Sequence, residues 1–300
     1  MIYVSRQRNS KDNIITESSG TLNFLYGCFL GRLLLKIMTR KFFSNLIAFY
    51  MNSKLSKSRI DKFVEKNNIN TFEYESKNYK SYNDFFTRKV IETKRPINAR
   101  SSILISPCDS KLTVYSINED LTLKIKDAYY SIDTLVDKEI LNDYIDGYAL
   151  VFRLTTDNYH RYCYVDGGSK DTNHRIDGIF HTVQPISLNN YNFFKTNTRE
   201  YTTLNTKNFG KVIQVEVGAM GVGRIVNHHE EATFKKGEEK GYFEFGGSTI
   251  VLLVQKNTIV IDEDILENSN EHIETIVKYG ERIGRAKTIK RIINKIKNLS

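Results

Sequence analysis

The chain has 300 residues, of which 40% are hydrophobic, 26% charged and 12% aromatic. This composition excludes a wholly disordered chain, a collagen and a polytopic membrane protein, and the length suits one large domain or two small ones. The net charge of +9 is concentrated at the ends, since residues 1–60 carry ten Lys and Arg against two acids and residues 281–300 carry seven against one. An acidic middle between two basic ends indicates an anionic partner, either lipid or nucleic acid.

The N-terminal region combines a polar start with a long apolar stretch. Residues 1–20 predict a mobile polar leader, and residues 22–67 predict helices. Arg32, Lys36 and Arg40 recur every four residues and interrupt the apolar stretch, so each uncharged half is too short to span a bilayer, which takes about 20 residues. A basic stripe on an apolar helix is typical of a helix that lies in a membrane interface. The alternative is an amphipathic helix packed against its own domain.

From residue 103 onward the apolar pattern changes to short segments of β-branched and aromatic residues separated by glycines. Strands are predicted over 112–117, 122–125, 148–155, 178–183, 212–217, 223–226, 241–245, 249–254 and 258–261. A polar-aromatic helix is expected within 78–98 and a basic helix over 271–300. Many strands with few helices between them predict an α+β fold with a β-rich antiparallel barrel or sandwich core. We expect two parts, residues 1–75 with the leader and membrane-associating helices, and residues 76–300 with the β-rich domain.

The cysteines and histidines point to neither a disulfide framework nor a metal site. Cys28, Cys108 and Cys163 are few for a chain that can bury a core without disulfides, so we expect a reducing compartment. Of the possible metal ligands, only His160 and Cys163 have a ligand-like spacing, and no second pair supports them. The sequence therefore predicts no metal.

The segment Phe245-Gly246-Gly247-Ser248-Thr249, followed by the apolar run 250–254, is the most unusual local feature. It is neither a phosphate loop nor a nucleophile elbow, because both of those lead into a helix. One interpretation is a glycine kink in a strand. The other is chemical, because a Gly carbonyl before a Ser hydroxyl is little hindered toward attack and glycine tolerates the strained backbone that attack requires.

Two further segments carry side chains suited to proton transfer. His160 lies in the run 157–164, which is dense in titratable groups, and histidine is the side chain most easily tuned for proton transfer near pH 7. A satisfied, partly buried histidine is the commoner role. Asp109 lies at the start of a predicted strand, where aspartate is more often a turn former than a catalytic group.

Taken together, these pieces resemble phosphatidylserine decarboxylases, and specifically the clostridial-type branch of that pyruvoyl-dependent family. The matching segments are collinear between about residues 80 and 260: Phe85-Phe86-Thr87-Arg88, Arg95-Pro96-Ile97, Ser106-Pro107-Cys108-Asp109-Ser110, Asp157-Asn158-Tyr159-His160-Arg161, His181-Thr182-Val183, Asn197-Thr198-Arg199-Glu200, Val217-Gly218-Ala219-Met220-Gly221-Val222-Gly223, Lys236-Gly237-Glu238 and Gly246-Gly247-Ser248-Thr249. Many family members carry a second histidine three residues after the first, where this chain has Cys163. His181 is therefore an alternative to His160 as the residue that transfers protons.

The resemblance implies a self-processing proenzyme. Ser248 would attack the carbonyl of Gly247, with His160 as the base and Asp109 orienting that histidine. The products would be a large chain, 1–247, and a small chain, 248–300, which begins with a covalent pyruvoyl group formed from Ser248.

The resemblance also implies the reaction and its setting. The pyruvoyl group would serve as electron sink while phosphatidylserine loses CO₂ and becomes phosphatidylethanolamine, with His160 or His181 protonating the α-carbon. The implied partners are phosphatidylserine and an anionic membrane surface rather than nucleic acid, at the cytoplasmic face of the cell membrane. Two alternatives stay open: a pyruvoyl decarboxylase of another amine, and a non-enzymatic lipid-binding module in which Gly247-Ser248 is only a kink.

Overall fold

A computed structural model describes residues 2–125, 128–133, 135–179, 181–182, 196–221 and 224–287. The strands of its main sheet are β1 (Ile2–Arg6), β2 (Ile14–Glu17), β4 (Ser110–Ser116), β7 (Tyr148–Leu154), β9 (Gly168–Lys170), β10 (His174–Ile176), β11 (Arg199–Thr206), β12 (Lys211–Gly221), β14 (Ala232–Phe234), β16 (Gly246–Val254) and β18 (Glu274–Val277). Three smaller sheets contain β13 (Ile225–Asn227), β15 (Glu239–Phe243) and β8 (Arg161–Cys163); β17 (Ile259–Ile261), β19 (Arg282–Ala286) and β3 (Ile103–Ile105); and β5 (Thr122–Ile125) and β6 (Ala128–Ser131).

The main sheet is mostly antiparallel, which confirms the predicted α+β class. Its strands follow the order β14-β9-β11-β12-β16-β7-β4-β18-β1-β2, with β10 paired to β11. Only β1 and β18 run parallel among its described pairs. Within the described residues β14 and β2 do not pair with each other, so the sheet is open and the predicted barrel closure is not observed.

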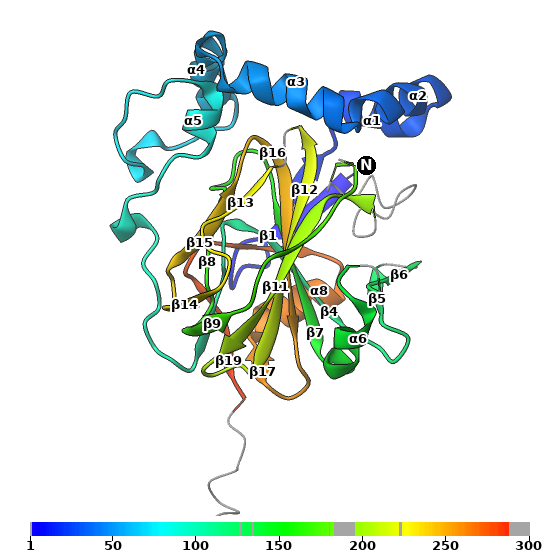
Figure 1. Cartoon of the computed structure of the whole chain (residues 1–300), viewed down its shortest axis with the longest axis vertical. Coiled ribbons are helices and arrows are strands. Elements are labelled where there is room, and N and C mark those ends of the chain that lie inside the picture. The colour runs from blue at the N-terminus through cyan, green and yellow to red at the C-terminus, as the bar shows by residue number, and fades with distance from the viewer. Residues whose placement is uncertain are drawn as a thin grey trace, which may run out of the picture.

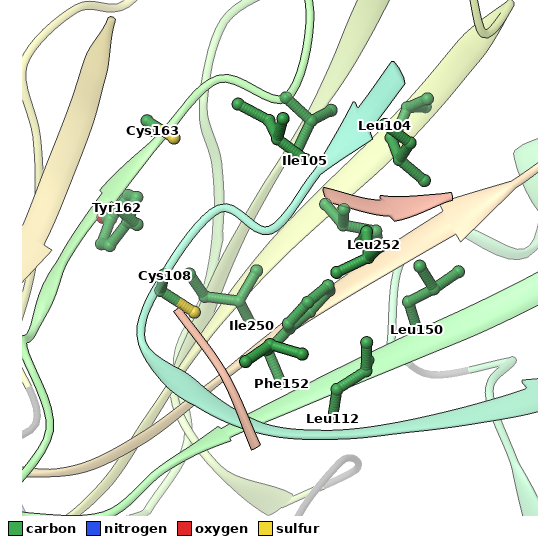
Figure 2. Packing of buried hydrophobic residues seen from close by; sticks show 14 of the residues in the cluster. Leu104, Ile105, Cys108, Leu112, Leu150, Phe152, Tyr162, Cys163, Ile250 and Leu252 are labelled. Atoms are coloured by element: carbon green, nitrogen blue, oxygen red, sulfur yellow. The ribbon is translucent and has the colours of Figure 1, made fainter. Parts of the chain in front are cut away.

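The centre of the sheet is buried on both faces. Ile250 and Leu252 of β16 join one apolar cluster, and Val251 and Leu253 join the cluster on the opposite face. An uninterrupted apolar run suits such a doubly covered strand. Figure 2 shows the first cluster, in which Ile250 and Leu252 lie beside Phe152 of the neighbouring β7. Side chains alternate along a strand, so Ser248 points to the same face as Ile250 and Leu252.

The helices within residues 22–67 are confirmed. The helices and 3-10 turns of the described chain are α1 (Gly20–Gly27), α2 (Phe29–Met38), α3 (Lys41–Asn52), η1 (Lys54–Arg59), α4 (Ile60–Lys66), η2 (Thr71–Glu73), α5 (Tyr82–Phe86), η3 (Glu92–Lys94), α6 (Lys138–Leu141), η4 (Asn142–Tyr144) and α8 (Glu263–Asn270). Figure 1 shows α1, α2 and α3 lying across the end of the sheet at which β12 ends and β16 begins. No single helix of the described chain combines the length and apolar character needed to cross a bilayer; α1 and α2 reach them only as a pair, bent by 101°.

The helix expected within 78–98 is much shorter than predicted. Ser81 caps the first turn of α5, whose side chains Phe85 and Phe86 are buried. The helix ends at Phe86, and Val90 then forms a bridge with Tyr74, so the chain is extended where a helix was expected.

The predicted leader and the predicted C-terminal basic helix are both wrong where the structure describes them. Residues 2–6 form β1, which pairs with β18, where Ser5 lies opposite Glu274. Ile273, Thr275 and Val277 are buried at every second position, which is a strand pattern rather than a helical stripe. Ion pairs join the first residues of the chain to residues 264–271. They are Arg6–Glu271, Arg8–Asp264 and Lys11–Glu267. Residues 288–300 lie outside the described residues.

The predicted strands are confirmed at 112–117, 122–125, 148–155, 212–217, 241–245, 249–254 and 258–261. Residues 180, 183 and 223 of the other two predicted strands lie outside the described residues. β13 contains Ile225 and Val226, and Ile179 forms one isolated bridge with Asn197.

Candidate active site

Ser248 lies near the start of β16, where the pairing with β12 becomes irregular. Gly218 lies opposite Ser248 and Gly221 opposite Gly246, so β12 contains one extra residue and forms a bulge. Gly246 has a φ of +143°, a backbone conformation that favours glycine. The Ser248 side chain is fully buried. The Gly247–Ser248 bond therefore belongs to a locally distorted part of an otherwise regular central strand.

His160 meets Ser248 from the small sheet that covers this face. It lies directly before β8, and its Nδ1 is 3.2 Å from Ser248 Oγ. Its Nε2 is 3.0 Å from the carbonyl oxygen of Thr155. A carbonyl can only accept a hydrogen bond, so Nε2 carries the proton and Nδ1 presents its lone pair to the serine hydroxyl. The structure thus brings together two residues that the sequence placed 88 positions apart, in a geometry suited to removing the serine proton.

The helix α5 packs over this pair. The Phe86 ring lies 4.2 Å from the His160 ring, centroid to centroid, and Phe86 also contacts Phe245 edge-on at 5.3 Å. Asn83 accepts a hydrogen bond of 2.9 Å from the backbone N–H of Phe245. The helix therefore fixes both the histidine and the chain that enters the Gly246–Ser248 segment. Phe86 stood out in the sequence only as part of a family segment, so this role was not predicted, although two adjacent phenylalanines in a polar stretch are a signal of burial.

Burial controls the ionisation of His160. Loss of solvent lowers the pKa of His160 to about 3, against smaller opposing effects from the Thr155 hydrogen bond and from nearby carboxylates. The imidazole is therefore neutral, and able to accept a proton, throughout the physiological range. In the unfolded chain its pKa is about 6.5. Its contribution to stability is thus present above about pH 6.5 and is lost as the pH falls toward 3.

We expect the self-cleavage rate to show no inflection near pH 6.5. A solvent-exposed histidine base would lose activity there by protonation, whereas the buried His160 stays neutral down to low pH. Proenzyme made by cell-free translation at one pH and then shifted to buffers between pH 5.5 and 8 can be followed on gels. A rate that halves at pH 6.5 would show that the base is an exposed group and not His160 as the structure places it.

Asp109 has different partners from those expected. Its carboxylate accepts hydrogen bonds from Arg95, at 2.9 Å from Nε and 2.8 Å from Nη2, and at 2.8 Å from the backbone N–H of Tyr279. The expected hydrogen bond to His160 is not formed, because both ring nitrogens of His160 face other groups. A two-pronged guanidinium is the stronger partner for a carboxylate. The charge of Asp109 still raises the pKa of His160 slightly, so the two residues interact through the electric field.

Cys163, at the place of the second family histidine, is unsuited to proton transfer. Its side chain is fully buried, and burial raises the pKa of the thiol to about 12. The thiol is therefore neutral near pH 7. Among the described residues, no three His, Cys, Asp or Glu side chains cluster closely enough to hold a metal ion.

His181 contacts α1 and Asn197. Its Nδ1 is 3.2 Å from the hydroxyl of Tyr26 in α1, and burial lowers its pKa to about 4. Asn197 donates hydrogen bonds of 2.8 Å to two carbonyl oxygens, those of His181 and Gly218. Gly218 is the residue opposite Ser248, so one amide side chain connects the His181 segment to the cleavage strand. Asn197 was another residue whose role the sequence did not reveal.

A cavity of about 260 Å³ adjoins His181 beneath α2. The other residues that line it are Leu35, Lys36, Thr39, Arg40 and Ile179. Two of the three basic residues noted in the sequence thus face a hollow next to a candidate site residue.

Comparison with known proteins gives a consistent family. The family model for phosphatidylserine decarboxylase matches residues 82–285, a range that contains Asp109, His160, His181 and Ser248. The chain is 50% identical over 268 residues to phosphatidylserine decarboxylase proenzyme 2 of Clostridium acetobutylicum, covering 89% of this chain and 92% of the relative. It is 40% identical over 289 residues to a phosphatidylserine decarboxylase proenzyme of Clostridium botulinum strain 657, covering 93% and 98%. A proenzyme of the same name from Clostridium kluyveri is 40% identical over 286 residues, covering 92% and 97%.

Proposed function

The chain belongs to the phosphatidylserine decarboxylase family, and we propose that it is a proenzyme whose Ser248–His160 pair performs the self-cleavage that yields the active decarboxylase. The reaction is the loss of CO₂ from phosphatidylserine, which leaves phosphatidylethanolamine. The observation that carries the proposal is the buried contact of 3.2 Å between Ser248 Oγ and the unprotonated His160 Nδ1. Ser248 directly follows the pair Gly246-Gly247, where the backbone is distorted.

The cleavage follows from these groups. His160 Nδ1 takes the proton of Ser248 Oγ, and the oxygen attacks the Gly247 carbonyl carbon. The His160 imidazolium returns this proton to the Ser248 nitrogen as the peptide C–N bond breaks, and an ester remains between Gly247 and the Ser248 oxygen. Loss of the Ser248 α-proton then expels the Gly247 carboxylate and leaves dehydroalanine at position 248. Water replaces its nitrogen, which leaves as ammonia, and a pyruvoyl group remains at the start of chain 248–300.

The residues present fit that group. Its carbonyl would supply an electron sink for the loss of CO₂ from an amino acid headgroup. Ser248 is fully buried, so the group derived from it would be shielded from water by the chain around it. After cleavage His160 no longer has the serine hydroxyl as its partner. We assign His160, which contacts Ser248, to processing. We assign His181 to the proton that the α-carbon of the headgroup takes up, because Asn197 connects its backbone to Gly218, which lies opposite Ser248.

Asp109 acts, in this proposal, as a positioning residue. It fixes Arg95 and the Tyr279 backbone in the core beneath the site, and its charge stabilises the imidazolium that forms when His160 takes a proton.

The proposal is tested with vesicles whose phosphatidylserine carries a label in the carboxyl carbon. We expect release of labelled CO₂, blocked by pretreatment of the enzyme with borohydride, which reduces a pyruvoyl carbonyl. Free serine and another amino-acid-bearing lipid serve as comparison substrates. Release from one of those but not from phosphatidylserine would favour a decarboxylase of another amine, and an uncleaved chain that only binds lipid would favour a binding module.

The helices over the site expose an unusual amount of apolar surface, and we propose that they dock on an anionic bilayer at the cytoplasmic face of the cell membrane. The exposed side chains are Phe24, Phe29, Leu30, Leu33, Leu34, Ile37, Phe42, Leu46, Phe49 and Leu55. Figure 1 places α1, α2 and α3 on one side of the molecule, so this surface can meet a flat bilayer. Three unpaired cysteines agree with a reducing compartment.

We expect the double variant Phe42→Ser/Phe49→Ser to lose most of its binding to phosphatidylserine vesicles. These side chains are 77% and 78% exposed on α3. Burying each in lipid is worth roughly 1.5–3 kcal/mol, or about tenfold to a hundredfold in affinity. Phe72→Ser is the matched control, since Phe72 is 85% exposed but lies in η2. Equal sedimentation of both variants with vesicles would contradict the proposed docking surface.

A further inference from the structure

We propose that the cavity beneath α2 binds the phosphate of the lipid headgroup, with Lys36 and Arg40 as its cationic ligands. This inference rests on the proposed function, because it takes phosphatidylserine as the substrate. It assigns the phosphate to one specific cavity. It also gives Lys36 and Arg40 a role that Arg32 does not share.

The arrangement of α2 produces this hollow. Leu35 and Thr39 are buried one turn apart, and Leu35 packs against Leu25 and Tyr26 of α1. Lys36, in the last turn of α2, and Arg40, directly after the C-cap Thr39, line the same cavity. The Thr39 hydroxyl is occupied, since it donates a hydrogen bond of 2.9 Å to the carbonyl of Leu35. All three basic side chains are exposed, but Arg32, one turn earlier, is not among the lining residues.

The charges at this cavity are uncompensated. Lys36 and Arg40 are exposed, and across the described part of the chain neither lies within salt-bridge distance of a carboxylate. His181 adds no positive charge, because burial lowers its pKa to about 4. Two cations that line one cavity repel each other, and an anion between them removes that cost. A phosphodiester, which carries one negative charge, fits this requirement.

The place of the cavity fits a headgroup that reaches the reacting residue. His181 lines the cavity, and Asn197 connects the backbone of His181 to Gly218, the partner of Ser248 in the sheet. A lipid whose phosphate lies at Lys36 and Arg40 can therefore extend its serine portion toward position 248. On the same helix, Leu33, Leu34 and Ile37 are exposed where the acyl chains would lie. One helix would thus hold the phosphate on one side and contact the acyl region on the other.

A soluble substrate separates this role from general attraction to a membrane. With dihexanoyl phosphatidylserine below its micelle concentration, we expect Lys36→Gln and Arg40→Gln each to raise KM about tenfold. A hydrogen bond to a charged group is worth about 1.5–3 kcal/mol, and 1.4 kcal/mol corresponds to tenfold. We expect kcat to change little and self-cleavage to be normal, because neither residue contacts Ser248 or His160. Arg32→Gln, of equal charge and on the same helix, should keep the wild-type KM, and Lys36→Arg should restore most of the affinity.

A binding measurement checks the same claim without catalysis. Phosphorus NMR titration of glycerophosphoserine against the uncleaved Ser248→Ala protein should show binding that Lys36→Gln or Arg40→Gln weakens and Arg32→Gln does not. If Lys36→Gln, Arg40→Gln and Arg32→Gln behave alike in both assays, the phosphate site is overturned while the decarboxylase proposal stands. If the wild-type enzyme releases no CO₂ from phosphatidylserine, the proposed function fails, and the titration alone decides whether the cavity binds the phosphate.

Discussion

Ser248→Ala is expected to remain a single chain of 34.8 kDa with no decarboxylase activity. The variant keeps the strand, since alanine fits where a buried serine was, but it lacks the oxygen that attacks Gly247. Both the cleavage and the pyruvoyl group depend on that oxygen, so we expect complete loss rather than a partial decrease. Intact mass and CO₂ release measure the two effects separately.

Thr249→Val is the matched control for this variant. Thr249 is the next residue, it is equally buried, and its hydroxyl has no hydrogen-bond partner in the described structure. Removing that hydroxyl costs no hydrogen bond, so Thr249→Val should cleave and react normally. Cleavage of Ser248→Ala at the same bond would show that another nucleophile performs the reaction.

The two histidines are expected to fail at different steps. His160→Gln should remain full-length or cleave about 10²–10⁴ times more slowly, because glutamine has no basic nitrogen to take the proton of Ser248. His181→Gln should cleave at the normal rate, since the structure shows His181 in contact with Tyr26 and Asn197 rather than with Ser248. Its decarboxylation should fall, because we assign His181 to the proton that the headgroup takes up.

A gel and an assay of cleaved protein decide between the assignments. A cleaved His160→Gln beside an uncleaved His181→Gln would reverse them. We choose glutamine rather than alanine because its side chain fills part of the volume of each buried ring. This limits the loss of packing, which could by itself reduce activity.

The sequence predicted the central strands well because their signal is local. The run 250–254 is apolar throughout and follows two glycines, and it forms a strand buried on both faces. The predictions for the two ends of the chain were wrong for the opposite reason. The pairing of β1 with β18 joins Ser5 to Glu274, and no local pattern reveals a partner so far along the chain. Without that partner, the start of the chain looked like a polar leader and residues 271–287 looked like an amphipathic helix.

The sequence singled out the residues of the candidate site but not their surroundings. Ser248 and His160 stood out by residue type and by family resemblance, and the structure brings them together. The partner of Asp109 could not be foreseen, because whether a carboxylate contacts a histidine or an arginine depends on which one the fold delivers within reach. The same limit hid the packing of Phe86 on His160 and the bridge that Asn197 forms.

The intact masses of the denatured, purified protein test the central claim most directly. We expect two chains, 1–247 and 248–300, with the small chain lighter by one ammonia than a chain that begins with serine and resistant to N-terminal sequencing. A preparation that decarboxylates phosphatidylserine while it remains one chain of 34.8 kDa would contradict the account, as would a small chain that begins with a free serine.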